Sequence, residues 1–414
     1  MADLDLSKLL SVSDAIAVID RIVVEPRVMV APSLEQIPGH ILQQEVVSDR
    51  DDPPVDKSLV DGYAARSADI LQNGSELRVI GSLLAGASVA KPLKPGECFR
   101  INTGAPVPPG ADTCVPVEQT QLLPGDRVRI LQAQPEGKFV IKRASQSSGG
   151  QTLLAPGTRL GPAQLAVCAQ VGASRPLVAM KPRVGVLTTG DEIVPYFEKP
   201  EPTQLRNSNA MLLGGLLLKL DCTVKRFEHA PDDRLTLRAI IKRMLDAAEL
   251  DVLFITGGLS MGERDHVTQV LTELRFDVHI EKLRIKPGKP FVFATRVQRT
   301  AGVDHTQYVF GLPGNPVSGY VCTLVLASRL LSRLAGAPVS THVVEAALSH
   351  ALPQNGPRQF YQPCVVAGDS VTPLDWVGSA DIATLARANA LLVRPESDAA
   401  RAVGERVNVL MMPG

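Results

Sequence analysis

Residues 183–275 alternate between apolar strand patterns and amphipathic helix patterns. The predicted strands are VGVLTTG (184–190), CTVKRFE (222–228) and VLFITGG (252–258), and the predicted helices cover about 209–220, 233–247 and the segment from 265 onward. In the second helix, Leu237, Ile240, Ile241 and Met244 fall on one face at helical spacing. Continuous apolar strands between amphipathic helices are typical of a parallel sheet with helices on both faces. This segment therefore predicts a doubly wound α/β domain.

Shorter strand patterns dominate the rest of the chain. Two separate helices are predicted over 13–22 and 162–172. Between them, residues 46–142 hold short β-type runs such as LRVIGSLL (77–84), separated by Gly and Pro turns. After about residue 337 the pattern returns to short strands. The sequence therefore predicts an inserted β-rich domain and a C-terminal β-rich domain.

Three loops of the α/β segment share a composition rich in Gly, Ser, Thr and Pro. They are LTTGDE (187–192), TGGLSMG (256–262) and GLPGNPVS (311–318), each after a predicted strand. Because parallel strands end at the same edge of a sheet, we expect these loops to open together. Glycines let backbone N–H groups approach an anion, while hydroxyls and helix N-termini add donors and partial positive charge. The loops predict a phosphate-bearing ligand, to which Lys286 and Lys289 of a nearby KPGKP segment could add cations.

Acidic residues follow the same strands. Asp191 and Glu192, Asp232 and Asp233, and Asp265 stand at predicted strand-to-helix junctions, where carboxylate oxygens could hold Mg²⁺ shared with phosphate. The glycine-rich loops and the acidic residues can also be explained without a ligand. Gly-rich turns are common between strands and helices, and acidic residues stabilise helix starts whatever the function.

Composition excludes several classes of protein. The 414-residue chain carries 43 basic and 43 acidic residues, so charge gives no reason to expect nucleic acid or an anionic membrane as partner. The N-terminal segment lacks the pattern of a signal peptide, and no later apolar run reaches the roughly 18 residues of a spanning helix, so a cytoplasmic location is expected. Six scattered cysteines without CxxC spacing predict reduced, mostly buried thiols rather than zinc ligands or disulfides.

An ordered set of motifs along nearly the whole chain resembles the MoeA family of molybdopterin molybdenumtransferases, which includes the E domain of gephyrin. The matching stretches are DKSLVDGYA (56–64), RINTGAPVP (100–108), TTGDE (188–192), TGGLSMGERD (256–265), KPGKP (286–290), LPGNPVS (312–318) and GSADIATLARANA (378–390). The resemblance implies an elongated homodimer whose subunits insert molybdate into adenylylated molybdopterin and release AMP, with Mg²⁺ assisting. A molybdopterin adenylyltransferase and apo-molybdoenzymes are the further partners that it suggests.

The resemblance also implies a division of the chain and a set of site residues. The expected parts are an N-terminal helix packed on the α/β domain (1–26), a linking domain (27–45 and 143–178), an inserted β-rich domain (46–142), an α/β molybdopterin-binding domain (179–336) and a C-terminal β-rich domain (337–414). Asp61, Glu192, Asp232 and Asp265 are the expected catalytic residues, with Asp61, Glu192 and Asp265 holding the metal. The expected cofactor-binding residues are Thr103, Gly104, Thr189, Gly190, Gly257, Gly258, Ser260, Gly262, Lys286, Lys289, Pro313, Gly314, Asn315, Pro316 and Ser318.

Asp61, Thr103 and Gly104 belong to a strap of the inserted domain that, by the resemblance, reaches the cleft of the partner subunit. Next to this strap the chain departs from the family pattern. Where the family has an acidic pair after the inserted domain, this chain has Ser145 and Gln146, and Lys57 replaces the usual Asn. Two alternatives to the insertase stay open. The replaced acidic pair supports a diverged, non-catalytic pterin-binding or scaffold protein. The other alternative is a nucleotide pyrophosphatase of the CinA kind, which shares only the α/β domain.

Overall fold

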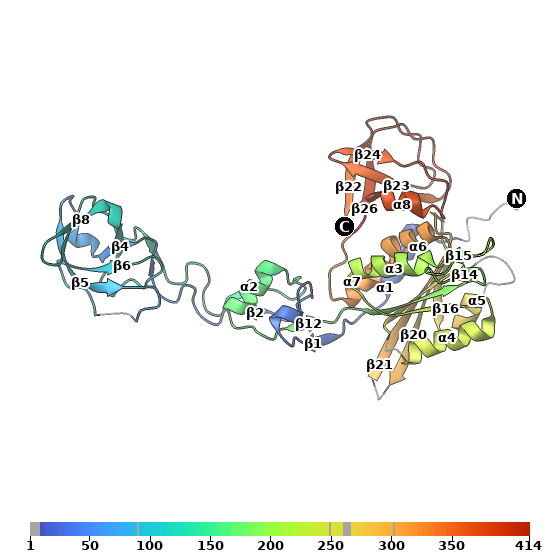
Figure 1. The fold of residues 1–414 in the computed structure, drawn as a ribbon, viewed down its shortest axis with the longest axis horizontal. Coiled ribbons are helices and arrows are strands. Elements are labelled where there is room, and N and C mark those ends of the chain that lie inside the picture. Colours follow the sequence, from blue (N-terminus) through green and yellow to red (C-terminus); the bar gives the residue numbers. More distant parts are fainter. Residues whose placement is uncertain (1–8, 89–90, 248–249, 260–265, 301–302) are drawn as a thin grey trace.

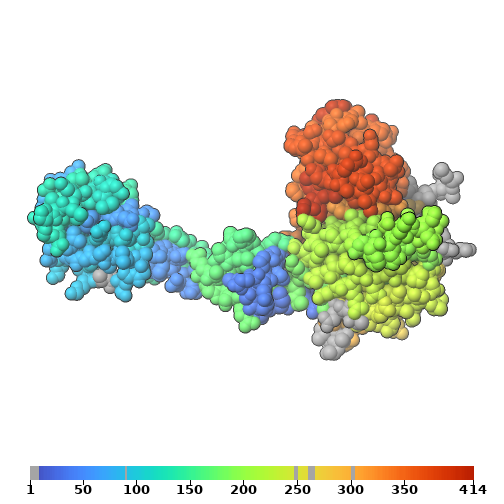
Figure 2. Space-filling model, in the orientation of Figure 1, coloured from blue at the N-terminus to red at the C-terminus, as the bar shows by residue number. Residues whose placement is uncertain are grey.

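A computed structural model describes residues 9–88, 91–247, 250–259, 266–300 and 303–414. The molecule is elongated (Figure 1). A β-rich domain lies at one end, a small linking domain lies in the middle, and the α/β domain lies with the C-terminal domain at the other end. The space-filling view shows that the connection on either side of the linking domain is narrow (Figure 2). The inserted domain is thus held far from the α/β domain of its own chain.

A six-stranded mixed sheet forms the centre of the α/β domain. Its strand order is β16 (Thr223–Ala230), β13 (Arg183–Thr189), β17 (Val252–Thr256), β21 (Val303–Leu312), β20 (Pro290–Thr300) and β18 (Asp277–Lys282). The first four strands are parallel, as the sequence predicts. β20 runs antiparallel to β21, and β18 runs antiparallel to β20, so β18 points the same way as the first four strands. Two residues separate β20 from β21, which suffices for a hairpin but not for a parallel crossover.

Helices cover both faces of this sheet (Figure 1). One face carries α1 (Val12–Arg21), α3 (Ser208–Lys219), α6 (Pro316–Cys322), the π-helical segment η5 (Thr323–Ala327) and α7 (Ser328–Leu334); the other carries α4 (Arg234–Ala247) and α5 (His266–Glu273). The apolar stripe predicted for the second helix is buried in α4. On the opposite face, Phe254 and Phe293 both stack on Phe310, with ring centroids 5.4 and 4.9 Å apart. Two hydrophobic cores therefore hold the strand ends rigidly in register.

The continuous helical segment Pro316–Leu334 is long and apolar enough to cross a membrane by length and composition, and the sequence analysis overlooked it. Within the described residues, 78% of its most apolar window is buried inside the protein. It packs against α3 and α1 in the core of the α/β domain. Its apolar composition is explained by this burial.

The linking domain is built from two passes of the chain. Short antiparallel pairs join β1 (Val28–Val30) to β12 (Leu177–Ala179) and β2 (Val46–Val47) to β11 (Thr152–Leu154), with η2 (Leu34–Gln36) and α2 (Pro162–Gln170) packed on them. The chain thus leaves for the inserted domain and returns from it side by side.

The inserted domain is a β structure with its own cores. Its sheet order is β7 (Thr113–Pro116), β4 (Gly62–Ala65), β6 (Glu97–Ile101), β5 (Glu76–Leu83), β9 (Arg127–Ile130) and β8 (Thr120–Leu123). A short pair, β3 (Lys57–Ser58) with β10 (Val140–Ile141), and the 3₁₀ turns η3 (Ser67–Asp69) and η4 (Val117–Gln119) complete it. These elements agree with the predicted β-rich character of the inserted domain, while its expected bounds, 46–142, stay a prediction, and β2 at their start pairs with β11 in the linking domain.

The C-terminal domain docks directly onto the α/β domain. Its strands are β22 (Val343–Leu348), β23 (Gln359–Ala367), β24 (Ser370–Pro373), β25 (Ala390–Arg394) and β26 (Arg406–Met411), with one helix, α8 (Ile382–Arg387). A short strand of the α/β segment, β19 (Ile285–Lys286), joins their sheet by pairing with β23. The backbone of Val317 in α6 also donates to the carbonyl of Ser379 at 3.0 Å. The start of the KPGKP loop (286–290) and the first turn of α6 are therefore both held by backbone hydrogen bonds to the C-terminal domain.

Candidate functional site

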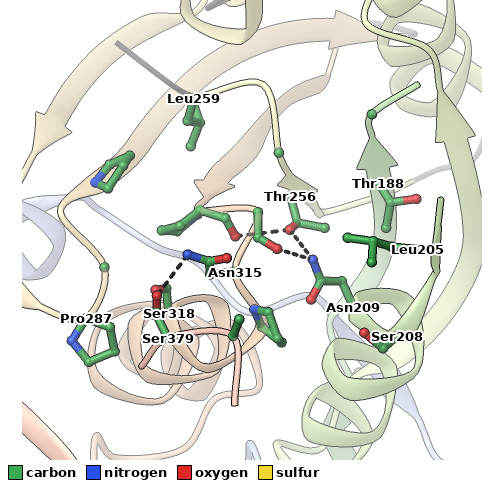
Figure 3. Close-up of a pocket in the computed structure, with 18 of the residues that line it drawn as sticks. Thr188, Leu205, Ser208, Asn209, Thr256, Leu259, Pro287, Asn315, Ser318 and Ser379 are labelled. Carbon is green, nitrogen blue, oxygen red and sulfur yellow. Dashed lines mark hydrogen bonds between the residues drawn. The ribbon is translucent and has the colours of Figure 1, made fainter. Parts of the chain in front are cut away.

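The carboxyl ends of β13, β17 and β21 open together into one cavity of about 910 Å³. The prediction that the three loops share an edge is confirmed, since Thr189, Thr256 and Pro313 all line this cavity (Figure 3). The predicted site residues that line it are Thr189, Gly190, Glu192, Asp232, Gly257, Gly258, Lys286, Lys289, Pro313, Gly314, Asn315, Pro316 and Ser318. A cavity of this size suits a ligand of several hundred daltons.

An asparagine that the sequence analysis missed ties two of the loops together. Asn209, in the first turn of α3, donates through Nδ2 to Thr256 Oγ1 at 3.1 Å and to the Gly314 carbonyl at 2.6 Å (Figure 3). Thr256 Oγ1 in turn donates to the Pro313 carbonyl at 3.2 Å. The loops after β17 and β21 are therefore held in a fixed relation, which the precise placement of a ligand requires.

One buried hydroxyl in the cavity wall lacks a partner. Thr189 is 6% exposed, and its Oγ1 makes no hydrogen bond within the described residues. A Cβ on Gly257 would lie 2.5 Å from this oxygen, and Gly257 has a φ of +96°, so only glycine fits there. A buried polar atom without a partner is costly, so this hydroxyl marks an unsatisfied polar position in the wall of the cavity.

Two lysines bring positive charge to the opposite wall. Lys286 and Lys289 flank Gly288, where a Cβ would lie 2.5 Å from Cys322 Sγ, so the loop is packed tightly onto α6. Burial lowers the pKa of Lys289, and the nearby charge of Arg358 lowers it further. Closely spaced cations of this kind are stabilised when a phosphate enters between them.

The acidic residues divide between two roles. Glu192 and Asp232 line the cavity, and the Asp232 backbone N–H donates to Asp191 Oδ1 at 3.0 Å. Asp233 instead accepts bonds from the backbone and the hydroxyl of Thr236, which lower the pKa of its carboxyl. The helix-start explanation is thus correct for Asp233. Among the described residues, no group of three His, Cys, Asp or Glu side chains could hold a metal ion unaided.

The C-terminal domain completes the cavity with residues that the sequence analysis did not select. Arg358, Trp376 and Ser379 all line it, and Asn315 Nδ2 donates to Ser379 Oγ at 2.8 Å (Figure 3). Of these three residues, only Ser379 lies in a motif of the family pattern, 378–390, and that motif did not indicate that the C-terminal domain lies beside the predicted loops.

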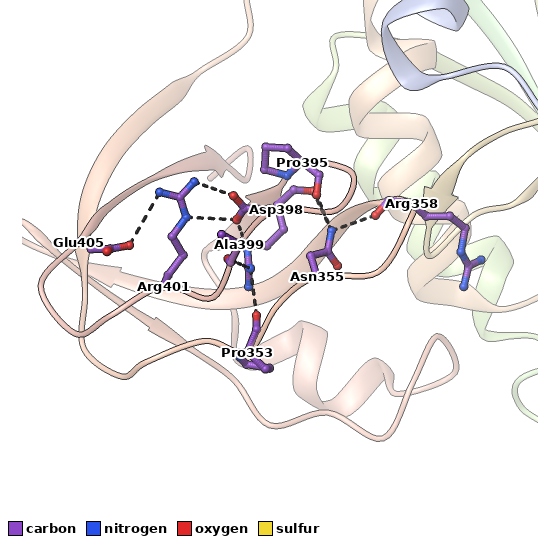
Figure 4. Close-up of polar contacts among 9 residues, drawn as sticks. Pro353, Asn355, Arg358, Pro395, Asp398, Ala399, Arg401 and Glu405 are labelled. Atoms are coloured by element: carbon purple, nitrogen blue, oxygen red, sulfur yellow. Dashed lines mark hydrogen bonds and ion pairs between the residues drawn. The ribbon is translucent and has the colours of Figure 1, made fainter.

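A polar network inside the C-terminal domain fixes the segment that carries Arg358 (Figure 4). Asn355 Nδ2 donates to the carbonyls of Arg358 at 3.0 Å and Pro395 at 2.5 Å. Behind it, the buried Arg394 donates through Nε to Asp398 Oδ2 at 2.6 Å. One face of the cavity therefore depends on a buried ion pair in another domain.

Known proteins match the chain from end to end. Family models match the MoeA N-terminal region (domain I and II) over residues 10–172, a probable molybdopterin binding domain over 185–333, and the MoeA C-terminal region (domain IV) over 345–412. The chain belongs to the MoeA family. The middle model covers the three glycine-rich loops and the lysine loop, which places the cavity on the molybdopterin-binding domain of the family.

Individual MoeA relatives agree with this assignment. The chain is similar to the molybdopterin molybdenumtransferase of Nostoc sp., with 31% identity over 386 residues, 91% of this chain and 87% of that protein. It is 28% identical to the enzyme of the same name from Staphylococcus aureus, over 92% of this chain and 90% of that protein. A MoeA crystal structure from Pyrococcus horikoshii superimposes with a TM-score of 0.84 at 30% identity, covering 98% of this chain and 100% of that one.

The MoeA strap residues lie away from the cavity of their own chain. Asp61, Thr103 and Gly104 belong to the inserted domain, at the far end of the molecule (Figure 1). Asp61 is exposed, and its Oδ1 accepts from the Thr103 backbone at 2.7 Å and the Thr103 hydroxyl at 3.1 Å. These bonds lower the pKa of the Asp61 carboxyl. Within one chain, the structure does not bring Asp61 together with Glu192 and Asp232.

The departure from the MoeA pattern lies near the same strap. Lys142 Nζ contacts Asp56 Oδ2 at 3.1 Å, and the Arg143 backbone donates to Asp56 Oδ1 at 2.8 Å. The backbone of Gln146 donates to the Asp52 carbonyl at 2.9 Å. Ser145 and Gln146 therefore lie in a segment that is hydrogen-bonded to Asp52 and Asp56, shortly before Asp61 in the chain.

Three predicted site residues, Ser260, Gly262 and Asp265, lie outside the described residues. Their assignment as MoeA site residues stays a prediction. α5 begins at His266, directly after Asp265.

Proposed function

We propose that this enzyme of molybdenum cofactor biosynthesis inserts molybdate into adenylylated molybdopterin and releases AMP. The observation that carries the proposal is the cavity of the molybdopterin-binding domain, where glycine-rich loops, an unpartnered Thr189 hydroxyl and two lysines converge. A substrate with a phosphoanhydride between pterin and AMP matches both the polar donors and the excess of cations. The relatives named molybdopterin molybdenumtransferase support this reaction.

The residues of the cavity would act by position and charge. Lys286 and Lys289 can offset the negative charge of the phosphates, including the charge that develops as AMP leaves. The backbone at Gly257 and Gly258 lets a phosphate oxygen approach closely, since neither residue carries a side chain at this wall of the cavity. The exchange at the dithiolene is a ligand transfer at molybdenum, so no covalent protein nucleophile is required.

The donors in the cavity are compatible with Mg²⁺. Glu192 and Asp232 line the same wall as the phosphate-binding loops, and Mg²⁺ is commonly held by one or two carboxylates together with substrate phosphates and water. Bound there, the ion would neutralise phosphate charge and polarise the anhydride. Asp265 is the third proposed ligand on this side, and Asp61 is the proposed ligand from the strap.

A homodimer would bring the strap to the cavity. Asp61 and Thr103 cannot join Glu192 within one elongated chain, so their participation needs a second copy in which the inserted domain reaches across. We place the enzyme in the cytoplasm, where the molybdopterin adenylyltransferase and the apo-molybdoenzymes would be its partners.

The second candidate is a non-catalytic pterin-binding protein, which the replacement of the acidic pair by Ser145 and Gln146 favours. Purified protein mixed with adenylylated molybdopterin, Mg²⁺ and molybdate distinguishes the two. Insertase activity is expected to release AMP and form active cofactor in equal amounts. Tight pterin binding without either product would refute the insertase and support the binding protein. The same mixture without molybdate tests the CinA-like alternative, because a pyrophosphatase would release AMP regardless.

A further inference from the structure

Trp376 stands out among the residues of the cavity. It is the only tryptophan of the chain, and among the described residues that line the cavity it is the only aromatic side chain. Most of the other lining residues carry hydroxyl, amide or charged groups, or are Gly and Pro. The cavity therefore offers one broad aromatic surface beside charged and hydrogen-bonding groups and smaller apolar side chains such as Leu205 and Leu259, an arrangement suited to recognising a ring within a charged ligand.

The indole ring of Trp376 packs against a second aromatic ring. Trp376 stacks on Phe360 of β23, with ring centroids 5.9 Å apart and planes 24° from parallel. Lys286 Nζ lies over the Phe360 ring, 4.5 Å from its centroid, and the backbones of Lys286 and Phe360 are paired between β19 and β23. The aromatic pair and the phosphate-binding lysine are thus parts of one rigid unit.

The backbone on both sides of Trp376 is also fixed. Before it, the Leu374 N–H donates to the Pro363 carbonyl at 3.0 Å. After it, the Val377 N–H donates to Asp381 Oδ2 at 3.3 Å, and Asp381 itself caps α8 by accepting from the Thr384 N–H at 3.0 Å. A side chain held in this way loses little conformational entropy when a ligand packs on it.

Trp376 is half-buried and lines the cavity together with Lys286 and Arg358. We propose that Trp376 stacks on a planar heteroaromatic ring of a phosphate-bearing substrate, with Lys286 and Arg358 beside the phosphate. The inference rests on the proposed function, in which two parts of the substrate carry such a ring: the adenine of the adenylyl group and the pterin. Aromatic side chains stack on nucleic-acid bases in other proteins with little dependence on base identity, because every such ring has a π face.

Because Trp376 is the only tryptophan of the chain, its fluorescence can report ligand binding. Intact protein is titrated with AMP while the fluorescence of Trp376 is excited at the red edge of indole absorption, where adenine does not absorb. Ribose 5-phosphate and inorganic phosphate serve as ringless controls. In a separate arm, calorimetry measures the affinity for 6-hydroxymethylpterin phosphate, so the two ring sources are distinguished. Quenching is expected with the ring-bearing phosphate that occupies the subsite and not with the ringless controls.

Two variants separate stacking from packing. Trp376→Leu keeps an apolar side chain and removes the π system, and it is expected to weaken binding of the recognised ring phosphate about tenfold. Trp376→Phe keeps an aromatic ring and is expected to lose less than about threefold. Binding of ribose 5-phosphate should change less than about twofold in either variant. Thermal unfolding of both variants confirms that the domain is intact.

Equal affinity of wild type and Trp376→Leu for both ring phosphates would overturn the stacking role while leaving the proposed function untouched. An equal loss for ribose 5-phosphate would also overturn it, because the defect would then concern the phosphate site or the loop. If wild-type protein bound neither AMP nor the pterin phosphate, the proposed function would fail together with the inference. Should Trp376→Leu not fold, the quenching of wild type and the affinity of Trp376→Phe still decide the matter.

Discussion

Replacing Asp398 by asparagine tests whether a buried ion pair holds the C-terminal face of the cavity. Asp398 is 6% exposed, and it bonds Arg394 Nε at 2.6 Å and Arg401 Nη2 at 2.6 Å (Figure 4). Asparagine keeps the size of the side chain but removes its charge. Arg394, 4% exposed, would then lose its buried anionic partner but keep the carbonyls of Pro353 and Ala399 as acceptors, at 3.0 and 2.9 Å.

The expected cost follows from this arrangement. Removing one partner of a buried ion pair typically costs about 3–5 kcal/mol in free energy of unfolding. Because Arg394 retains two carbonyl acceptors and the asparagine oxygen can accept one bond, we expect the lower end, about 3 kcal/mol, or about 150-fold in the folding equilibrium. The Asn355 contacts should loosen with it, so Arg358 would be less well placed at the cavity.

Urea unfolding followed by the fluorescence of Trp376 measures this cost, since the only tryptophan lies in the C-terminal domain. Asp369→Asn is the matched control in the same domain. Its ion pair with Arg406 spans 2.9 Å, but Asp369 is 73% exposed, so the solvent screens the pair and a much smaller loss of stability is expected. Equal destabilisation by the two substitutions would refute the buried-pair argument.

The effect of Asp398→Asn should also depend on pH in a defined direction. Hydrogen bonds from Arg401 and then Arg394 lower the pKa of Asp398 in the folded protein. A carboxylate with a lowered folded pKa contributes its stability above the unfolded value, about 3.9, and loses it as the pH falls through the folded value. The difference between wild type and variant is therefore largest near neutral pH and shrinks below about pH 4.

Three further experiments test the site itself. Gly257→Ala would place a Cβ 2.5 Å from Thr189 Oγ1 at a φ of +96°, so AMP release should fall about a hundredfold, and near-normal release would mean that the loop does not position the substrate. A mixed dimer of one Asp61→Asn and one Gly257→Ala chain, co-expressed with different tags, should recover about half of the wild-type activity, because one of its two sites keeps both intact elements. No recovery would place the whole site within one chain. Restoring acids with Ser145→Glu and Gln146→Asp should raise turnover, whereas an unchanged rate would show that the pair is not needed.

The location of the cavity could be predicted because it depends on local patterns. Thr189 ends β13, Gly257 and Pro313 directly follow β17 and β21, and parallel strands necessarily end at one edge. Sequence order also brought Lys286 close, since it follows β18 in the same domain. For these residues, periodicity and turn chemistry were sufficient.

The rest of the site depends on contacts that no local pattern encodes. Asn209 faces inward because of how α3 packs against β13, and an asparagine early in a helix has no signature that distinguishes this from a surface position. Arg358, Trp376 and Ser379 reach the cavity only because β19 pairs with β23 and α8 packs on α6. Such docking between domains is set by complementary surfaces, which a single sequence does not show.

The charge of the cavity bears on the proposed role of the strap. Among the described residues, the cavity of one chain is lined by four cationic side chains and two carboxylates; they are Arg206, Lys286, Lys289 and Arg358, and Glu192 and Asp232. That excess suits a phosphoanhydride but offers few acidic ligands for a metal ion. In the strap region, Asp56 is paired with Lys142, and Asp51 is paired with Arg143 at 2.6 Å.

Asp61 differs from these acidic neighbours, because among the described residues its hydrogen-bond donors, Thr103 and Asn102, are neutral. Its charge is stabilised by these bonds and by the nearby charge of Arg100, but no ion pair of the described residues cancels it, so we expect Asp61 to be the strap carboxylate best suited to meet a cationic site. With Ser145 and Gln146 in place of acids, the strap has fewer carboxylates to offer than the family pattern. Asp61 should therefore be more sensitive to neutralisation here than in a relative that keeps the acidic pair.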